Sequence, residues 1–177
     1  MNELKLHKIS LRNKIKRFIW GFIQSSFFRF SPRQAHFFRV FLLKIFGANI
    51  GSGVHIYPKA KIWAPWNLAM ESNSSIDDYV DCYNVAPVKI GANTAISRYV
   101  FLCTATHDYS KKNRPLLISP IKVGSKVWIA ADVFVGPGVT INNNSVILAR
   151  VFISKDVPRS VVVHQKQNYL IKKREHG

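Results

Sequence analysis

Residues 123–153 read VGSKVWIAADVFVGPGVTINNNSVILARVFI, and an aliphatic side chain recurs in this stretch at every sixth position. The aliphatic positions are Val123, Ile129, Val135, Ile141, Ile147 and Ile153. Four residues further on, each repeat has a small or β-branched residue: Val127, Val133, Val139, Ser145 and Val151. A period of six fits neither an α-helix nor a simple strand, but it is typical of a β-helix, in which short strands stack coil upon coil. Both positions are expected to face the core, because one repeat cannot bury its apolar face alone.

The same ladder begins upstream, at Ile50, Ile56, Ile62, Leu68, Ile90, Ile96 and Leu102. A sandwich of ordinary strands is the alternative, but it predicts irregular spacing. We expect the ladder to lose register between Asn73 and Lys89, where a wider coil or a pocket wall would form from Tyr79, Asp81, Tyr83 and Asn84. Glycines follow aliphatic positions at the turns and are expected to adopt backbone angles that other residues avoid: Gly51, Gly91, Gly124 and Gly136. The predicted fold is mainly β, a parallel β-helix over residues 47–163.

The chain is strongly basic, with 26 Lys and Arg against 9 Asp and Glu and a formal net charge of +17. This charge favours nucleic acid, an anionic membrane surface or a phosphorylated ligand as partner. No nucleic-acid-binding motif is present, so nucleic acid is disfavoured. Cys82 and Cys103 have neither disulfide-framework nor zinc-site spacing, and basic residues interrupt every N-terminal apolar run. We therefore expect a cytoplasmic protein.

Residues 1–46 mix Lys and Arg with Phe, Trp, Ile and Leu at helical spacing, and Ser31-Pro32 suits a break between two helices. Two compatible roles are open for this basic helical segment. It could cap the open end of the β-helix, or it could lie on the inner face of the membrane with aromatic side chains among the acyl chains. Residues 164–177 form a basic C-terminal tail.

The ladder breaks at His107-Asp108, and residues 108–122 form a loop too long for so regular a solenoid unless it has a function. His107 falls outside the coil, where its imidazole suits a general base that removes a proton from a hydroxyl. Asp108 or a backbone carbonyl could fix its tautomer. The other histidines are interpreted as surface residues, and Cys103 is only a weak candidate for a covalent nucleophile.

Several motifs together resemble the hexapeptide-repeat O-acetyltransferases, most closely the group of colanic acid biosynthesis acetyltransferases. They are GANIGSG, IWAPWNL, YNVAPVKIGANTAIS, LCTATHDYS, WIAADVFVGPGVTI and SKDVP, and they span nearly the whole chain. The resemblance implies a left-handed β-helix that assembles as a homotrimer, with acetyl-CoA in a groove between subunits. It also implies direct transfer, without a metal, to a sugar or lipid-linked oligosaccharide used for exopolysaccharide, capsule or O-antigen.

The resemblance also implies roles for individual residues. His107 is the base, with Asp108 beside it, and Asn84 positions the acceptor. Residues lining the acetyl-CoA groove are Trp128, Ala131, Ala149, Ser154 and Lys155, while the phosphates would meet Lys172, Lys173 and Arg174. Two departures from the family pattern stand out: Ala130 replaces a usual Gly, and VHQKQNY from Val163 replaces a Gly-Asn-Pro-Ala turn. His164 or Lys166 could substitute for the contacts of that turn.

Three other functions are compatible with parts of the sequence. A β-helical carbonic anhydrase needs three imidazoles around zinc, but Lys112 stands where the second ligand is expected. An acyltransferase using acyl carrier protein shares the pantetheine arm and is harder to distinguish. A non-enzymatic membrane scaffold would keep the ladder and the basic helices without needing Asn84, His107 and Trp128 together.

Overall fold

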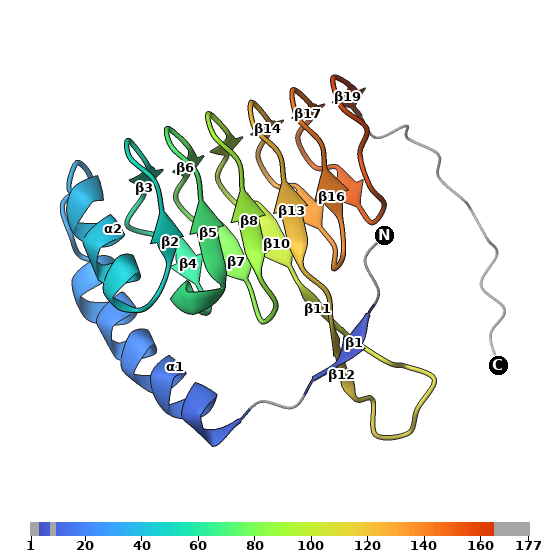
Figure 1. Cartoon of the computed structure of the whole chain (residues 1–177), viewed down its shortest axis with the longest axis horizontal. Coiled ribbons are helices and arrows are strands. Elements are labelled where there is room, and N and C mark those ends of the chain that lie inside the picture. The colour runs from blue at the N-terminus through green and yellow to red at the C-terminus, as the bar shows by residue number, and fades with distance from the viewer. Residues whose placement is uncertain (1–3, 8–9, 165–177) are drawn as a thin grey trace, which may run out of the picture.

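A computed structural model describes residues 4–7 and 10–164, and it confirms the predicted parallel β-helix (Figure 1). Sheet I contains β2 (Asn49–Ile50), β5 (Leu68–Met70), β8 (Val88–Ile90), β13 (Ile121–Val123) and β16 (Thr140–Ile141). Sheet II contains β3 (His55–Ile56), β6 (Ser75–Ile76), β9 (Ala95–Ile96), β14 (Trp128–Ile129), β17 (Val146–Ile147) and β19 (Val162–Val163). Sheet III contains β4 (Lys61–Ile62), β7 (Asp81–Tyr83), β10 (Phe101–Cys103), β15 (Phe134–Val135) and β18 (Phe152–Ile153). Each complete coil therefore gives one strand to each sheet.

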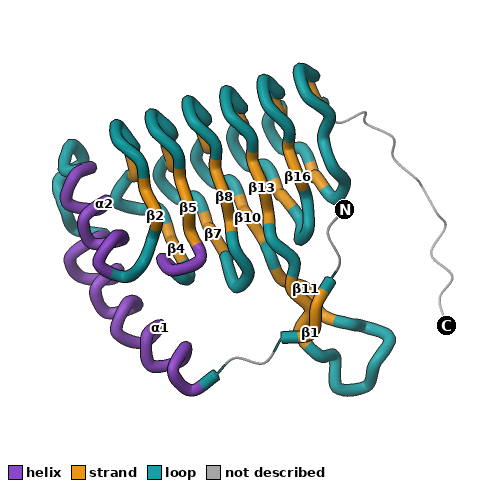
Figure 2. Tube along the Cα trace, in the orientation of Figure 1, coloured by secondary structure: helices purple, strands orange, loops and turns teal. Residues whose placement is uncertain are grey.

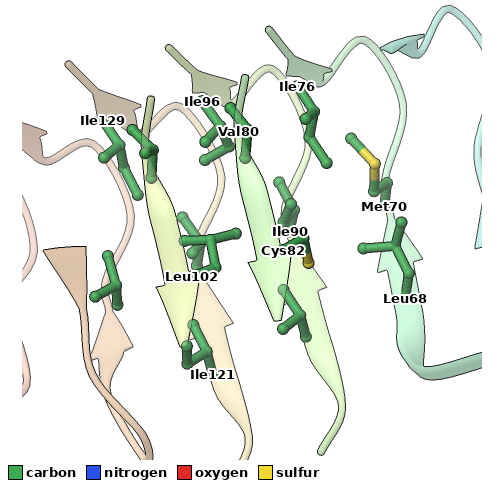
Figure 3. Packing of buried hydrophobic residues seen from close by; sticks show 14 of the residues in the cluster. Leu68, Met70, Ile76, Val80, Cys82, Ile90, Ile96, Leu102, Ile121 and Ile129 are labelled. Carbon is green, nitrogen blue, oxygen red and sulfur yellow. The ribbon is translucent and has the colours of Figure 1, made fainter. Parts of the chain in front are cut away.

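Inward side chains of consecutive coils lie above one another and form the core (Figure 3). In sheet II, Ile96 pairs in register with Ile76 on one side and with Ile129 on the other. These three side chains are 0%, 1% and 0% exposed for Ile76, Ile96 and Ile129. Burying a side chain of this size is worth roughly 1.5–3 kcal/mol, so the stacked columns supply much of the stability of the fold.

The loss of register expected between Asn73 and Lys89 occurs in the spacing of the sequence, at the corner between β7 and β8, but not in the pairing of the strands. Cys82 pairs in register with Ile62 and Leu102, and its fully buried thiol takes the place of an aliphatic side chain. The spacing along the sequence shifts at two longer corners: the one after β4, which includes a 3-10 turn, η2 (Pro65–Asn67), and the one after β7, which contains Asn84. The pairing of the strands continues without interruption through this part of the β-helix.

The reason expected for the corner glycines is also wrong. Gly91 and Gly124 lack the positive φ that is found at Gly47, Gly53 and Gly138. A Cβ at Gly91 would instead lie 2.5 Å from the backbone carbon of Gly124, and one at Gly124 would lie 2.7 Å from the backbone nitrogen of Asn143. These two glycines are needed because stacked turns approach each other too closely to leave room for a side chain.

A helical cap covers the first coil of the β-helix (Figure 1). It consists of α1 (Leu11–Ile23), the π-helix η1 (Gln24–Phe28) and α2 (His36–Ile45). Each of the three elements buries one large apolar side chain against the core: Trp20, Phe28 and Leu43. The capping role considered for this segment is therefore present in the structure.

Side chains of the cap pair with the backbone of the first coil. β4 is the outermost strand of sheet III, so its outer edge has no neighbouring strand to pair with. There, Trp20 Nε1 donates to the Ile62 carbonyl at 2.7 Å, and the Ile62 amide donates to Gln24 Oε1 at 2.7 Å. The cap thus supplies the hydrogen bonds that another coil would otherwise provide.

Arg39 joins α2 to β3 through a fully buried guanidinium group. Its Nε donates to the Ile56 carbonyl at 2.5 Å, and its Nη atoms donate to Ser31 Oγ, the Pro32 carbonyl and the Arg33 carbonyl at 2.6–2.7 Å. Burial lowers the pKa of this guanidinium. These oxygen acceptors offset the loss of water around the charge.

The substitution Arg39→Met should lower the free energy of unfolding by about 2–4 kcal/mol, because buried oxygen atoms would lose their donor. Thermal unfolding followed by circular dichroism measures the change. Arg29→Met, at an exposed position, is the matched control. Equal unfolding midpoints for the two variants would contradict this account of the cap.

Candidate active site

A β-hairpin interrupts the solenoid between β10 and β13 (Figure 2). Its strands are β11 (Ala105–His107) and β12 (Leu116–Ile118), which pair antiparallel with His107 opposite Leu116. β1 (Lys5–Leu6) pairs antiparallel with the other edge of β12. The hairpin thus leaves the β-helix at the corner between sheets III and I, and the N-terminal strand braces it.

His107 ends β11 with an exposed imidazole. Its Nδ1 lies 2.7 Å from the carbonyl oxygen of Arg114, on the returning side of the hairpin. Because a carbonyl only accepts hydrogen bonds, Nδ1 carries the proton, and the lone pair of the neutral ring is on Nε2. Of the two ways to fix the tautomer that the sequence left open, the structure uses the backbone carbonyl.

Asp108 turns away from this hydrogen bond. Its Oδ1 accepts from the amide and the hydroxyl of Ser110 at 3.1 and 2.5 Å, and its Oδ2 lies 3.5 Å from Lys111 Nζ. The bonds from Ser110 are the main cause that lowers the pKa of this carboxyl. Asp108 therefore shapes the turn that follows β11.

Asn84 lies at the same corner as the hairpin, but it is fully buried. Its Oδ1 accepts from the Ala64 amide at 2.9 Å, and its Nδ2 donates to the Ala64 carbonyl at 2.7 Å. Asn67 Nδ2 donates in turn to the backbone carbonyls of Asn84 and Val85. Both ends of the Asn84 amide thus hold two consecutive corners together.

The thiol of Cys103 is buried and donates to the carbonyl of Ala105 at 3.1 Å. Burial raises the pKa of this thiol, so it is less nucleophilic than an exposed cysteine. Among the residues that the structure describes, no group of three His, Cys, Asp or Glu side chains could hold a metal ion.

The residues predicted to line the acetyl-CoA groove fall into two groups. Trp128 begins β14, so it lies on a strand of sheet II. Ala131 and Ala149 follow at the corner between sheets II and III, stacked so that the Arg150 amide donates to the Ala131 carbonyl at 3.0 Å. Ser154 and Lys155 lie after β18, at the corner between sheets III and I.

One chain therefore does not bring all the predicted residues together. Asn84, His107, Ser154 and Lys155 lie at the corner between sheets III and I. The second group lies on the opposite side of sheet III, with Trp128 on sheet II and with Ala131 and Ala149 at the corner between sheets II and III. Ala130 is buried, and His164 is exposed after β19. Lys166, Lys172, Lys173 and Arg174 lie outside the described residues.

Sequence reasoning missed two partners of these residues. Ser97 Oγ accepts from Trp128 Nε1 at 3.0 Å and orients the half-exposed indole. The Arg114 carbonyl, which orients His107, is a backbone group, so no residue type in the sequence indicates it. Ser97 could have been inferred from the sequence, because it lies two residues after Ala95, and Ala95 pairs in register with Trp128 of the next coil.

Comparison with known proteins decides the family, although no protein-family model matches the chain. The chain is 38% identical over 162 residues to the putative colanic acid biosynthesis acetyltransferase WcaF of Escherichia coli (strain K12), an alignment that covers 92% of this chain and 89% of that protein. The chain belongs to the hexapeptide-repeat acetyltransferase family. The resemblance read from its motifs is thereby confirmed.

Two solved structures share the fold of this acetyltransferase. The hexapeptide-repeat acetyltransferase VCA0836 of Vibrio cholerae O1 biovar eltor, complexed with acetyl-CoA, has a TM-score of 0.78 at 24% identity and covers 86% of this chain and 84% of its own. A galactoside acetyltransferase in complex with coenzyme A has a TM-score of 0.73 at 25% identity, with 97% and 92% covered. In both comparisons the match thus covers most of this chain and most of the other protein.

Within this acetyltransferase, Asn84→Ala should lower the free energy of unfolding by about 1–3 kcal/mol, because the amide and carbonyl of Ala64 would both lose a buried partner. Thermal unfolding tests this directly. Thr106→Ala, at an exposed position of β11, is a control that removes a hydroxyl without opening the corner. An unchanged midpoint for Asn84→Ala would remove its structural role.

Proposed function

We propose that this enzyme transfers an acetyl group from acetyl-CoA to a sugar hydroxyl during synthesis of a surface polysaccharide, with His107 as the general base. The observation that carries the proposal is the hydrogen bond from Nδ1 to the Arg114 carbonyl, which leaves the basic Nε2 on an exposed ring. The names of its relatives support the substrates, since WcaF is named for colanic acid and the galactoside acetyltransferase is bound to coenzyme A.

The residues of the two groups fit acetyl-CoA. Trp128, half of whose surface is exposed, offers an aromatic face, and Ala131 and Ala149 beside it have no side chain beyond Cβ to obstruct a narrow pantetheine arm. Lys155 is exposed and suits a phosphate. When bound, the thioester would supply the electrophilic acetyl carbon.

In the proposed reaction, His107 Nε2 accepts the proton of the sugar hydroxyl as the hydroxyl oxygen attacks the acetyl carbon. A C–O bond forms and the C–S bond breaks, and the imidazolium then returns the proton to the departing thiolate. The Arg114 carbonyl stabilises the imidazolium through the Nδ1 proton in the meantime. Direct transfer is favoured over an acyl-enzyme because Cys103 is buried and hydrogen-bonded to Ala105.

His107→Ala should lower turnover of acetyl-CoA with a sugar acceptor by about 10² to 10⁴-fold, the usual contribution of a general base. The unfolding temperature should not change, because the ring is exposed and contributes nothing to the core. His55→Ala removes another exposed imidazole, on β3, and should retain activity. Wild-type turnover by His107→Ala would exclude this residue from the mechanism.

We further propose that the site is completed between subunits of a homotrimer. Two observations support this: the predicted residues fall into two separate groups, and aromatic side chains project from the outer faces of the strands. Of these, Trp128 is 51% and Phe152 is 62% exposed, and the rings of Phe101, Phe134 and Phe152 follow one another along sheet III. Apolar surface of this kind is typical of an interface.

Co-expression of two variants, each altered in one of the two groups, tests the shared site. His107→Ala and Trp128→Ala chains, mixed equally at random, should recover about a quarter of wild-type activity, because about one interface in four would join an intact His107 corner to an intact Trp128 corner. Light scattering should give a mass three times that of the chain. An active monomer, or no recovery in mixed assemblies, would contradict the proposal.

A further inference from the structure

We propose that the outer face of the helical cap binds the surface of an anionic phospholipid bilayer, so that the enzyme works at the membrane. This inference does not depend on the acetyl transfer. It rests on the apolar side chains of the cap that the β-helix leaves uncovered, and on the charges that flank them.

α1 has two opposite faces. Leu11, Ile15, Phe18 and Phe22 follow the spacing i, i+4, i+7 and i+11, and their side chains are 74%, 54%, 81% and 62% exposed. Trp20 lies on the other side of α1, as does Gln24, the first residue after this helix. Both form hydrogen bonds with the first coil. At about 100° per residue, these two sets point in nearly opposite directions. The outward stripe therefore contributes nothing to capping.

α2 repeats this division. Phe37, Phe41 and Ile45 are 80%, 58% and 61% exposed, whereas Arg39 and Leu43 are fully buried. A residue every fourth position places the exposed set on one face of the helix. Both helices of the cap therefore present large apolar side chains to the outside while burying the opposite side.

The apolar surface is continuous from α1 to α2. The rings of Phe22 and Phe27 lie 6.5 Å apart. Phe27, Phe30 and Phe37 then line one cavity of about 430 Å³ between η1 and α2. Half of the residues that line this cavity are phenylalanines, which suits a hydrocarbon chain, and so large an uncovered apolar surface is typical of an interaction site.

Charge selects an anionic partner for this surface. No acidic residue occurs between Glu3 and Glu71. Lys14 flanks the α1 stripe on one side and Arg12 on the other, and Lys44 lies in the last turn of α2; all three are exposed. A second copy of the chain docked on this face would bring like charges together, whereas anionic headgroups would attract them.

The geometry fits a helix lying in the interface. Among the described residues, no helix is long and apolar enough to cross a membrane. α1 has 13 residues, so it is about 20 Å long, and its capping side is fixed to the first coil. Apolar side chains of such a helix reach into the boundary between headgroups and acyl chains, with basic side chains beside them.

The anchor also lies next to the proposed active site along the chain. β1 pairs with β12 of the hairpin that carries His107, and α1 begins shortly after β1. If the proposed function holds, the acceptor class that suits this arrangement is a sugar linked to a membrane lipid. Its lipid would remain in the bilayer while the sugar reaches His107.

Sedimentation of the full-length protein with vesicles tests the anchor. We expect binding to phosphatidylcholine vesicles that contain phosphatidylglycerol, weaker binding to phosphatidylcholine alone, and partial release by salt. The combined variant Phe18→Ser, Phe22→Ser, Phe37→Ser and Phe41→Ser should lose at least about tenfold in partition. Its unfolding temperature should not change, because all four side chains are exposed.

Two triple variants of equal net charge test the role of the basic side chains on the cap. Arg12→Gln, Lys14→Gln and Lys44→Gln together should weaken binding to the anionic vesicles by about fivefold per residue. The control Lys89→Gln, Lys122→Gln and Lys126→Gln removes three exposed charges from the β-helix and should bind nearly as the wild type does.

Two results would overturn the anchor: vesicle binding by the phenylalanine variant equal to that of the wild type, or a lipid-free assembly that this variant alone disrupts. The second result would make the face an interface between copies of the chain. Acetylation of a soluble sugar should be unchanged in these variants, so a failure of the proposed function would appear there and not in the sedimentation.

Discussion

The fold depends on pairing the outer edge of its first coil. Within a β-helix, each coil satisfies its backbone against the coils above and below, so the first coil has one edge without a partner. Here Trp20 and Gln24 bond both backbone groups of Ile62, and Arg39 bonds the carbonyl of Ile56. The helices are therefore part of the solenoid, and removing them would expose both apolar core and unpaired backbone.

That constraint explains why capping and membrane binding need not compete. A helix that caps with one face must leave the other face outside, and the sequence of α1 makes that other face apolar as well. Trp20 is 1% exposed while Phe18, two residues before it, is 81% exposed. An ordinary surface helix would have polar residues at outward positions such as that of Phe18. The cap holds the outer stripe rigidly, which reduces the ordering required on binding.

The sequence predicted the fold well because the hexapeptide period reports directly on which side chains face inward. The prediction failed where the residue type was misleading. Cys82 is not aliphatic, although it occupies a core position, and Gly124 was expected to need an unusual φ, whereas it is needed because there is no room for a side chain. His107 is a candidate from the sequence because the ladder breaks beside it. The Arg114 carbonyl could not be found, since a backbone acceptor seven residues away leaves no mark in the sequence. Asn84 is also a candidate from the sequence, but its burial against Ala64 depends on a contact between two coils, which the sequence does not show.

The position of the hairpin connects these elements. β11 continues from the end of sheet III and β12 leads back to sheet I, so the hairpin is fixed to the β-helix at both ends. β1 adds a third strand, and from there the chain runs into the cap. The orientation of His107 is thus set by one carbonyl within the hairpin, and the hairpin is tied through β1 to the segment that begins α1. An imidazole held in this way needs no carboxylate to orient it, which leaves Asp108 free to form the turn with Ser110.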